Sequence, residues 1–290
     1  MPSKVVAHIV IVNLVLWTTF LITACSTSSQ HESDRYIEKA QRAHEADRVA
    51  EARTFARLAL EDGRRASEAR EILAALSRAR ADKLTSEGEY LSAHDAYLEA
   101  ADYESTPSRR GQDRVNALQA GDRAGLADDT LMELALVALQ DLPRDIELRS
   151  DIARRAEDRG AHELATDQYL WLFSAQPENT GVGLRLGILY LNQDRPNDAV
   201  SVLQRVYELE PNNVQAALNL AAGYTELLLY REAAEIFQQL QQRFPEHPAV
   251  LRRHADFEEA RGRHHRAREL RQKAGDASPG IEQREMRPLR

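Results

Sequence analysis

The sequence predicts an all-α protein made of stacked helical pairs, and three observations support this fold class. Five prolines recur at intervals of thirty-four residues, namely Pro143, Pro177, Pro211, Pro245 and Pro279. A fixed period of this length is typical of repeated supersecondary units that stack on one another. Residues that favour helices are frequent, and only 6% of the residues are aromatic. Five of the ten prolines belong to the repeat, so few of them would interrupt a helix.

Small and apolar residues recur in phase with these prolines and predict how the helices pack. One column holds Leu131, Ala165, Ala199, Ala233 and Ala267, and the column seven residues later holds Ala138, Leu172, Val206, Leu240 and Ala274. Positions seven apart lie on one face of a helix, so this face is expected to contact the neighbouring helices. Larger residues are expected to fill the space between units, namely Tyr169, Leu203 and Phe237. An isolated pair could not bury its apolar face, so each unit should depend on its neighbours.

The N-terminal segment is typical of a targeting signal. Lys4 precedes an apolar run over residues 5–22, which ends in the sequence Ile22-Thr23-Ala24-Cys25. This segment resembles the bacterial lipoprotein signal, in which small residues precede a cysteine that is lipidated and becomes the mature N-terminus. The resemblance implies a signal peptide over residues 1–24 and lipidation of Cys25. The alternative is an uncleaved membrane anchor, because an apolar run of this length nearly spans a bilayer.

The residues around Cys25 bear on the destination of the chain. In the lipoprotein family an aspartate after the cysteine usually signals retention at the inner membrane. Ser26 occupies that position here, so the resemblance implies the outer membrane, with the chain facing the periplasm. Residues 25–32 are expected to form the lipidated cysteine and a flexible tether. Cys25 is the only cysteine, so the sequence excludes an intramolecular disulfide and the usual zinc clusters.

Residues 33–111 are predicted to form two degenerate repeats. Alanines and tyrosines at helical spacing fit units at 33–66 and 74–107. Neither unit ends with a proline in the expected column, since Pro107 lies two residues late. Short insertions at 67–73 and 108–111 are expected to break the phase of the repeat.

Residues 112–275 are predicted to form the regular part of the repeat, with units at 112–145, 146–179, 180–213, 214–247 and 248–281. Gly187-x-x-Tyr190 and Ala221-x-x-Tyr224 open two of these units, and Glu210-Pro211 and Phe244-Pro245 end their second helices. This pattern resembles the tetratricopeptide repeat, a pair of helices joined by a tight turn. The resemblance implies a right-handed superhelix, an α-solenoid, in which the first helix of each pair lines a groove.

The last unit departs from the pattern in a way that predicts the end of the stack. Glu258 and Arg271 occupy the columns that hold Tyr224 and Phe237 one repeat earlier. A solenoid needs a polar terminal repeat, because no further unit covers its outer face. These two residues therefore predict a polar cap. The tail over residues 276–290 contains Ser-Pro-Gly and mixed charges and is expected to be disordered.

The sequence contains no pattern typical of catalysis or of a bound cofactor. The phosphate-binding glycine loop, the His-Glu-x-x-His motif and the Gly-x-Ser-x-Gly motif are absent from it. His254 and His264 could meet across a helical pair, but zinc requires three or four ligands, and arginines surround these histidines. A net charge of −8 argues against binding to nucleic acid. We therefore expect no catalytic residue, metal, cofactor, nucleic acid or small-molecule substrate.

The first helix of the unit at 180–213 carries two apolar stripes, and the second predicts a binding site. Leu186, Leu189 and Tyr190 suffice for stacking, whereas the second stripe consists of Leu184, Ile188 and Leu191. The family geometry implies that this second stripe faces the groove beside Leu218 and Ala222. A polar column accompanies it and would orient an acidic or polar partner, namely Arg185, Asn219 and Arg253. The alternative is that a neighbouring loop or the tail covers the stripe.

Two residues of this polar column resemble part of the carboxylate clamp by which some tetratricopeptide domains hold a peptide C-terminus. The other clamp positions fall on Leu184, Ile188 and Ala249, which have no charged or amide group. The sequence therefore does not predict a complete clamp.

These features predict a protein-binding scaffold rather than an enzyme. The chain is expected to be an outer-membrane lipoprotein whose periplasmic solenoid binds other envelope proteins, such as a secretin or an assembly factor. The architecture resembles lipoproteins that serve pilus assembly, secretion or polysaccharide export. Two alternatives stay open: an adaptor for peptidoglycan or its hydrolases, and an enzyme with a site hidden in the solenoid.

Overall fold

The computed structural model describes residues 32–276, and every element of regular structure in that range is a helix. This confirms the all-α prediction. The structure divides into two compact units, with the boundary between Asp145 and Ile146. Within residues 32–276 no helix is both long and apolar enough to cross a membrane. The predicted signal 1–24, Cys25 with most of the tether, and the tail after Asp276 lie outside the described residues.

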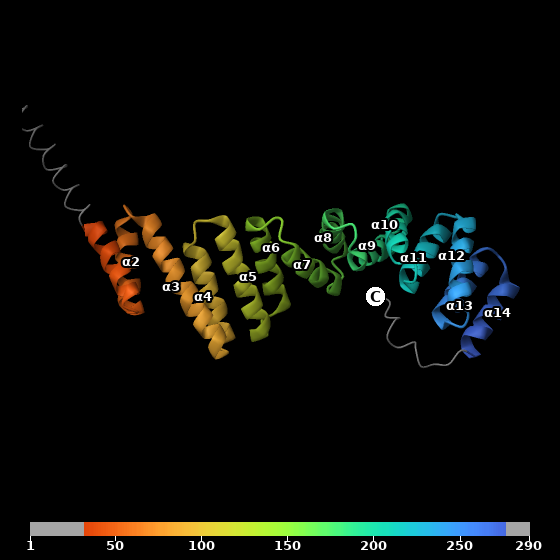
Figure 1. Cartoon of the computed structure of the whole chain (residues 1–290), viewed down its shortest axis with the longest axis horizontal. Helices are drawn as coiled ribbons and strands as arrows, with labels where there is room; N and C mark the ends of the chain where they lie inside the picture. Colours follow the sequence, from red (N-terminus) through yellow and green to blue (C-terminus); the bar gives the residue numbers. More distant parts are fainter. Residues whose placement is uncertain (1–31, 277–290) are drawn as a thin grey trace, which may run out of the picture. The chain divides into compact units, whose positions relative to one another are not determined.

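The N-terminal unit is a succession of helices that each pack against the next (Figure 1). Residues 32–45 are helical, and the helices that follow are α2 (Val49–Asp62), α3 (Ala66–Glu87), α4 (Tyr90–Tyr103), α5 (Pro107–Ala124) and α6 (Asp128–Asp141). Apolar contacts join them, as where Ile37 and Ala59 pack against Ala69 of α3.

The two predicted insertions lengthen helices of this unit instead of breaking the repeat. Residues 67–73 lie inside α3, which has 22 residues, and residues 108–111 lie inside α5, which has 18, whereas α7 has 13. Segments of seven and four residues add about two turns and one turn of helix, so the apolar face keeps its direction. Pro107 begins α5, where its missing N–H is not needed, so it does not close a unit.

Ion pairs with buried carboxylates also join the helices of the N-terminal unit. Arg78 of α3 donates from Nε and Nη2 to the two carboxylate oxygens of Asp113 in α5, each at 2.7 Å. Arg110 and Arg114 of α5 share Asp141 of α6. Their hydrogen bonds hold the pKa of Asp141 below its usual range, against the effect of burial. The helices are thus fixed by charge-assisted hydrogen bonds as well as by apolar contacts.

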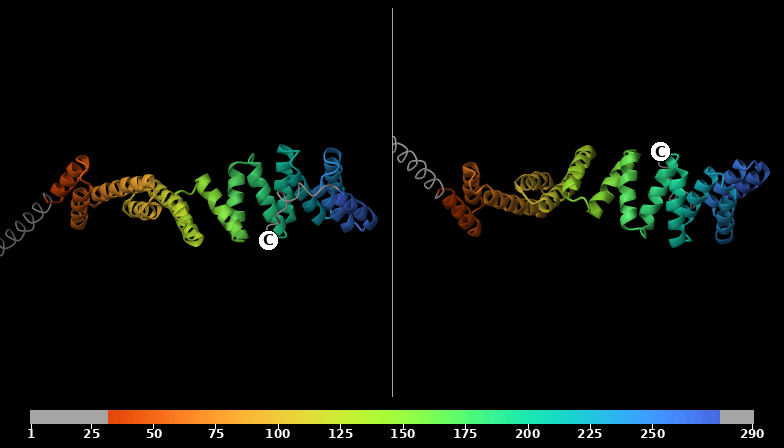
Figure 2. Two further views of the ribbon diagram at one scale, coloured as in Figure 1. Left: turned by 90° about the horizontal axis from the view of Figure 1, so that it is seen from below. Right: turned by 90° about the horizontal axis from the view of Figure 1, so that it is seen from above.

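The C-terminal unit consists of four regular helical pairs (Figures 1 and 2). The pairs are α7 (Ile146–Asp158) with α8 (His162–Ala175), α9 (Thr180–Asn192) with α10 (Pro196–Leu209), α11 (Val214–Glu226) with α12 (Tyr230–Arg243), and α13 (Pro248–Ala260) with α14 (His264–Asp276). Each of these four pairs starts at the first residue of a unit expected from the sequence, whereas the expected unit at 112–145 starts inside α5 and belongs to the N-terminal unit. Asn179 and Asn213 cap α9 and α11, since their side chains accept hydrogen bonds from the N–H groups of Val182 and Ala216.

The core of the stack lies where the two repeating columns predicted it. All ten residues of these columns are 2% exposed or less, and Tyr169, Leu203 and Phe237 are buried as well. Close approach of the helices requires glycine at some crossings. A Cβ atom on Gly183 of α9 would lie 2.6 Å from Cγ2 of Val206 in α10, closer than real contacts allow. Small residues at these crossings therefore mark where the two helices of a pair pack most closely.

The last pair differs from the predicted polar cap at one position. Arg271 is exposed and pairs with Asp256 and Glu259, as a cap residue should. Glu258 is only 6% exposed, and its Oε1 lies 3.3 Å from Nε2 of His254. The prediction was therefore wrong for Glu258. Its partner His254 faces inward, where the histidine ring stacks on the ring of Phe237 with centroids 4.8 Å apart, and Glu258 is buried beside it. Burial lowers the pKa of His254 and so favours its neutral form.

We expect Phe237→Ala to destabilise the C-terminal unit by about 3–5 kcal/mol, through lost burial and the cavity that remains. Hydrogen exchange should accelerate most in α11, α12 and α13, because the Phe237 ring contacts the rings of His254 and Phe257. Leu209→Ala is the control, since Leu209 is 39% exposed and its truncation should change stability little. Equal effects of the two substitutions would contradict the assigned core.

Candidate partner-binding site

The eight residues predicted to line a groove lie on the first helices of three successive pairs in the C-terminal unit. Helix α9 carries Leu184, Arg185, Ile188 and Leu191; α11 carries Leu218, Asn219 and Ala222; α13 carries Arg253. Helix α11 contacts both α9 and α13, so the three helices lie side by side. The structure therefore brings the predicted residues onto one set of neighbouring helices.

The two apolar stripes of α9 differ in burial. Leu186, Leu189 and Tyr190 are 4% exposed or less and belong to the core. Leu184, Ile188 and Leu191 are only half-buried, as is Ala222 of α11. Leu191 extends toward α11, where its Cδ2 lies 3.5 Å from the place a Cβ of Gly223 would take. Helix α9 thus retains an apolar surface after stacking is complete.

Leu218 does not belong to this exposed apolar surface. Its exposed fraction is 8%, and the neighbouring Ala216, Ala217, Leu220 and Ala221 of α11 are also buried. Leu218 was expected beside the second stripe from the geometry that the family resemblance implies. We name the remaining residues Leu184, Ile188, Leu191 and Ala222 the α9 stripe.

Arg185 is held by the protein itself, in a contact that the sequence prediction missed. Its Nη1 donates to Oε2 of Glu157 in α7 at 2.8 Å. The hydroxyl of Tyr169 in α8 donates to the same oxygen, also at 2.8 Å. The Glu157 side chain is only 2% exposed, and among the described residues its Oε1 has no hydrogen-bond partner. Burial and the bond to Glu157 raise the pKa of Tyr169 above its usual range, so Tyr169 stays a donor.

The other two members of the polar column have different environments. Nδ2 of Asn219 donates to the carbonyl oxygen of Gln215, 2.9 Å away and one turn earlier in the same helix. Arg253 is exposed and makes no ion pair or hydrogen bond with the residues that the structure describes. Its charge opposes the rise that burial and Asp194 cause in the pKa of Glu226. Of the three residues, Arg253 is the one whose charged group is open to a partner.

The histidines of the last pair are each engaged by a carboxylate. His254 contacts Glu258, and Nδ1 of His264 lies 4.0 Å from Glu259. Residues 32–276 contain no group of three or more side chains placed to hold a metal ion.

The repeat pattern contains no signal that identifies the Glu157 contact. The column of Glu157 holds Leu191, Thr225 and Glu259 in the repeats that follow, so a carboxylate is not an exception there. A buried carboxylate needs a donor from a neighbouring helix. Arg185 lies six residues before that column on the following first helix, so the period does not pair the two residues.

Stacked helical pairs in register define the described chain as an α-solenoid. A family model described as tetratricopeptide repeat matches residues 182–213 and 215–247, which are the pairs α9–α10 and α11–α12. These residues form tetratricopeptide repeats, and the fold is of the tetratricopeptide type. No curated protein matches the sequence.

Two solved structures are similar in fold. One is MamA, residue 41 to the end, from Desulfovibrio magneticus RS-1, with a TM-score of 0.50 and 17% identity over 58% of this chain and 94% of that chain. The other is a tetratricopeptide repeat protein from Parabacteroides merdae, with a TM-score of 0.49 and 20% identity over 71% of this chain and 80% of that chain.

We expect Arg185→Ala to lower the stability of the C-terminal unit by about 1–3 kcal/mol, because Glu157 would keep a buried charge with one donor fewer. Arg253→Ala is the matched control, from the same column without such a contact, and should leave the melting temperature unchanged. Thermal unfolding followed by circular dichroism measures both. The assigned role of Arg185 is wrong if the two variants melt together with the wild type.

Proposed function

We propose that this chain is a membrane-anchored scaffold whose C-terminal unit binds another envelope protein through the α9 stripe. The observation that carries the proposal is the second apolar stripe of α9. Leu186, Leu189 and Tyr190 are buried in the stack, whereas Leu184, Ile188 and Leu191 stay only half-buried and leave apolar surface accessible. Apolar surface with a polar rim is typical of protein interaction sites. Tetratricopeptide repeats are themselves a fold of interaction scaffolds.

The charges beside the α9 stripe indicate what such a partner presents to it. Arg253 offers an exposed guanidinium on the α13 side of the stripe, and its charge also acts on the carboxyl group of Glu226. On the α7 side, Arg185 is 53% exposed, but Glu157 offsets its charge. A partner segment with apolar side chains at its centre and a carboxylate directed toward α13 matches this distribution. The carboxylate would give orientation, and the apolar side chains would supply the affinity.

The place of action that we propose follows from the N-terminal sequence. Lipidation of Cys25 would hold the chain at the outer membrane, facing the periplasm, since each buried methylene of an acyl chain contributes about 0.8 kcal/mol. The tetratricopeptide units would then reach other envelope proteins, such as a secretin or an assembly factor. We propose a role in assembling a pilus, a secretion system or a polysaccharide export system.

The α9 stripe is tested by Ile188→Asp. Ile188 is half-buried, so the variant should keep its helical circular dichroism signal while its affinity for the partner falls about tenfold or more, as expected for losing one apolar contact. The measurement is capture of the cognate envelope protein from solubilised membranes, followed by a titration of the purified pair.

Two controls bracket this test. Leu189→Asp places a charge at a site that is 0% exposed and should unfold the unit. Leu209→Asp places a charge at an exposed leucine at the end of α10 and should affect neither fold nor binding. If Ile188→Asp stays folded and binds as the wild type does, the α9 stripe is not the partner site.

The anchor is tested by Cys25→Ala. We expect the variant to leave the membrane fraction or to accumulate as an unprocessed precursor, because the acyl chains would have no attachment point. Fractionation and intact-mass measurement of the wild type check this. A wild-type chain that is neither cleaved nor acylated would show that the N-terminal segment is an uncleaved anchor.

A further inference from the structure

Leu228, in the turn between α11 and α12, adopts a backbone conformation that disfavours leucine. The corresponding turn positions of the four C-terminal pairs all have positive φ, at 70°, 55°, 60° and 77° for Gly160, Asp194, Leu228 and Gly262. Glycine tolerates this left-handed region and aspartate enters it with local hydrogen bonds. A leucine Cβ comes too close to the following carbonyl oxygen. Leu228 is the exception among these turns.

The same turn also exposes its apolar side chains. Leu228 is 68% exposed and Leu229 is 41% exposed, and Leu227 beside them is half-buried. Glycine or aspartate at position 228 would relieve both the backbone strain and the exposure, as in the adjacent pairs. A residue that is unfavourable in conformation and in solvation points to a role outside folding.

The turn that contains Leu228 lies close to the turn between α13 and α14. The ring of Tyr230 is 6.3 Å from the ring of Phe257 in α13. The guanidinium carbon of Arg261, at the end of α13, lies 5.1 Å from the centroid of the same Phe257 ring. The Phe257 ring thus contacts one residue of the segment 227–231 and one residue of the segment 261–266. We name these two segments together the Leu228 edge.

The Leu228 edge is rich in basic residues. Its two segments contain no acidic residue and six basic ones, namely Arg231, Arg261, Arg263, His264, His265 and Arg266. Their acidic partners lie on the adjoining helices: Arg231 is 3.4 Å from Glu235, and Arg263 is 3.5 Å from Glu258. The pair of Arg231 with Glu235 is exposed on both sides and contributes little stability, so Arg231 can exchange partners at low cost, whereas Glu258 is buried.

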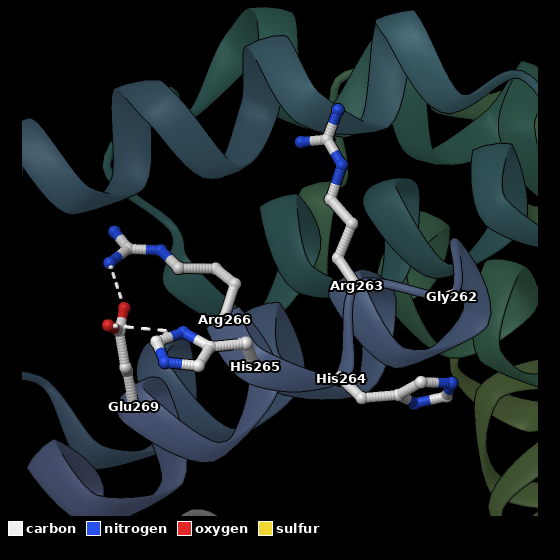
Figure 3. Close-up of a pocket in the computed structure, with 6 residues that line it drawn as sticks. All are labelled: Gly262, Arg263, His264, His265, Arg266 and Glu269. Atoms are coloured by element: carbon white, nitrogen blue, oxygen red, sulfur yellow. Dashed lines mark hydrogen bonds and ion pairs between the residues drawn. The ribbon is translucent and has the colours of Figure 1, made fainter.

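Residues 262–266 and Glu269 line an open hollow of about 490 Å³ at the last turn. Figure 3 shows that Arg266 and His265 both reach Glu269, while Arg263 and His264 point in other directions. The side chains of Arg263 and His264 are 57% and 70% exposed. Their donors are therefore available to an anionic group that approaches this edge.

We propose that the Leu228 edge rests on a phospholipid surface that contains anionic headgroups. Exposed leucines beside a tyrosine and several arginines are the combination that favours the membrane interface, where apolar side chains enter the acyl boundary and cations remain among the phosphates. Arginine binds phosphate oxygens through two parallel N–H donors. The contact involves the turns of the last two pairs and does not use the α9 stripe, so the stripe stays open to a protein partner.

The test uses the full chain reconstituted with vesicles of phosphatidylcholine alone, or of phosphatidylcholine mixed with phosphatidylglycerol. Hydrogen exchange of residues 227–231 and 261–266 is measured with each. We expect exchange in both segments to slow about tenfold or more on the anionic vesicles relative to the neutral ones, because anionic headgroups attract the arginines of the edge. Because the anchor is present with both lipids, the comparison isolates the Leu228 edge.

Leu228→Asn is the decisive variant, because asparagine tolerates positive φ and removes the apolar side chain without adding charge. It should melt at the wild-type temperature or above, yet lose the protection on anionic vesicles. Leu91→Asn, at a leucine of α4 that is 56% exposed, is the matched control and should keep it. Arg263→Gln together with Arg266→Gln should remove the difference between the two lipid mixtures.

Three results would overturn the proposal. The first is equal exchange of the Leu228 edge on neutral and anionic vesicles. The second is protection that persists in Leu228→Asn. The third is protection that appears without vesicles and rises with protein concentration, which would assign the edge to contact between copies of this chain.

Discussion

The stack depends on how closely its helices approach, and small residues at the crossings set that distance. A Cβ on Gly183 would collide with Val206, and the column with Ala165, Ala199 and Ala233 is fully buried. Because the backbones are close there, larger residues such as Tyr169 and Phe237 can fill the neighbouring space without leaving voids. Each pair completes the apolar core of the next, so the fold is a property of neighbours rather than of single repeats.

The fold could be predicted from the sequence wherever packing repeats. The columns through Ala199 and Val206 identify buried positions because each pair meets the same neighbours in the same way. Prediction was weaker in the N-terminal unit, where Ala69 and Leu73 lie in a segment read as an insertion but are buried in α3. A residue count locates a break in the repeat but does not say whether the added residues form a loop or more helix.

The binding surface was predictable in part. Periodicity located the α9 stripe, because a helix needs one apolar face to stack and α9 has two. Periodicity could not show that Leu218 is buried or that Arg185 bonds to Glu157, because both depend on how particular neighbouring helices pack. Contacts that occur once, such as the hydroxyl of Tyr169 on Glu157, leave no periodic trace. Leu228 is visible only in the backbone, as a positive φ at a leucine.

The lengthened helices α3 and α5 have a consequence for how this chain can vary in length. One residue added or removed inside a helix rotates all that follows by about 100°, which would turn the buried side of α3 toward solvent. Additions of four or seven residues bring the buried side back to within about 40° or 20° of its direction. A helix of this unit can therefore lengthen by about one turn, roughly 5.4 Å, while its buried side still faces the core.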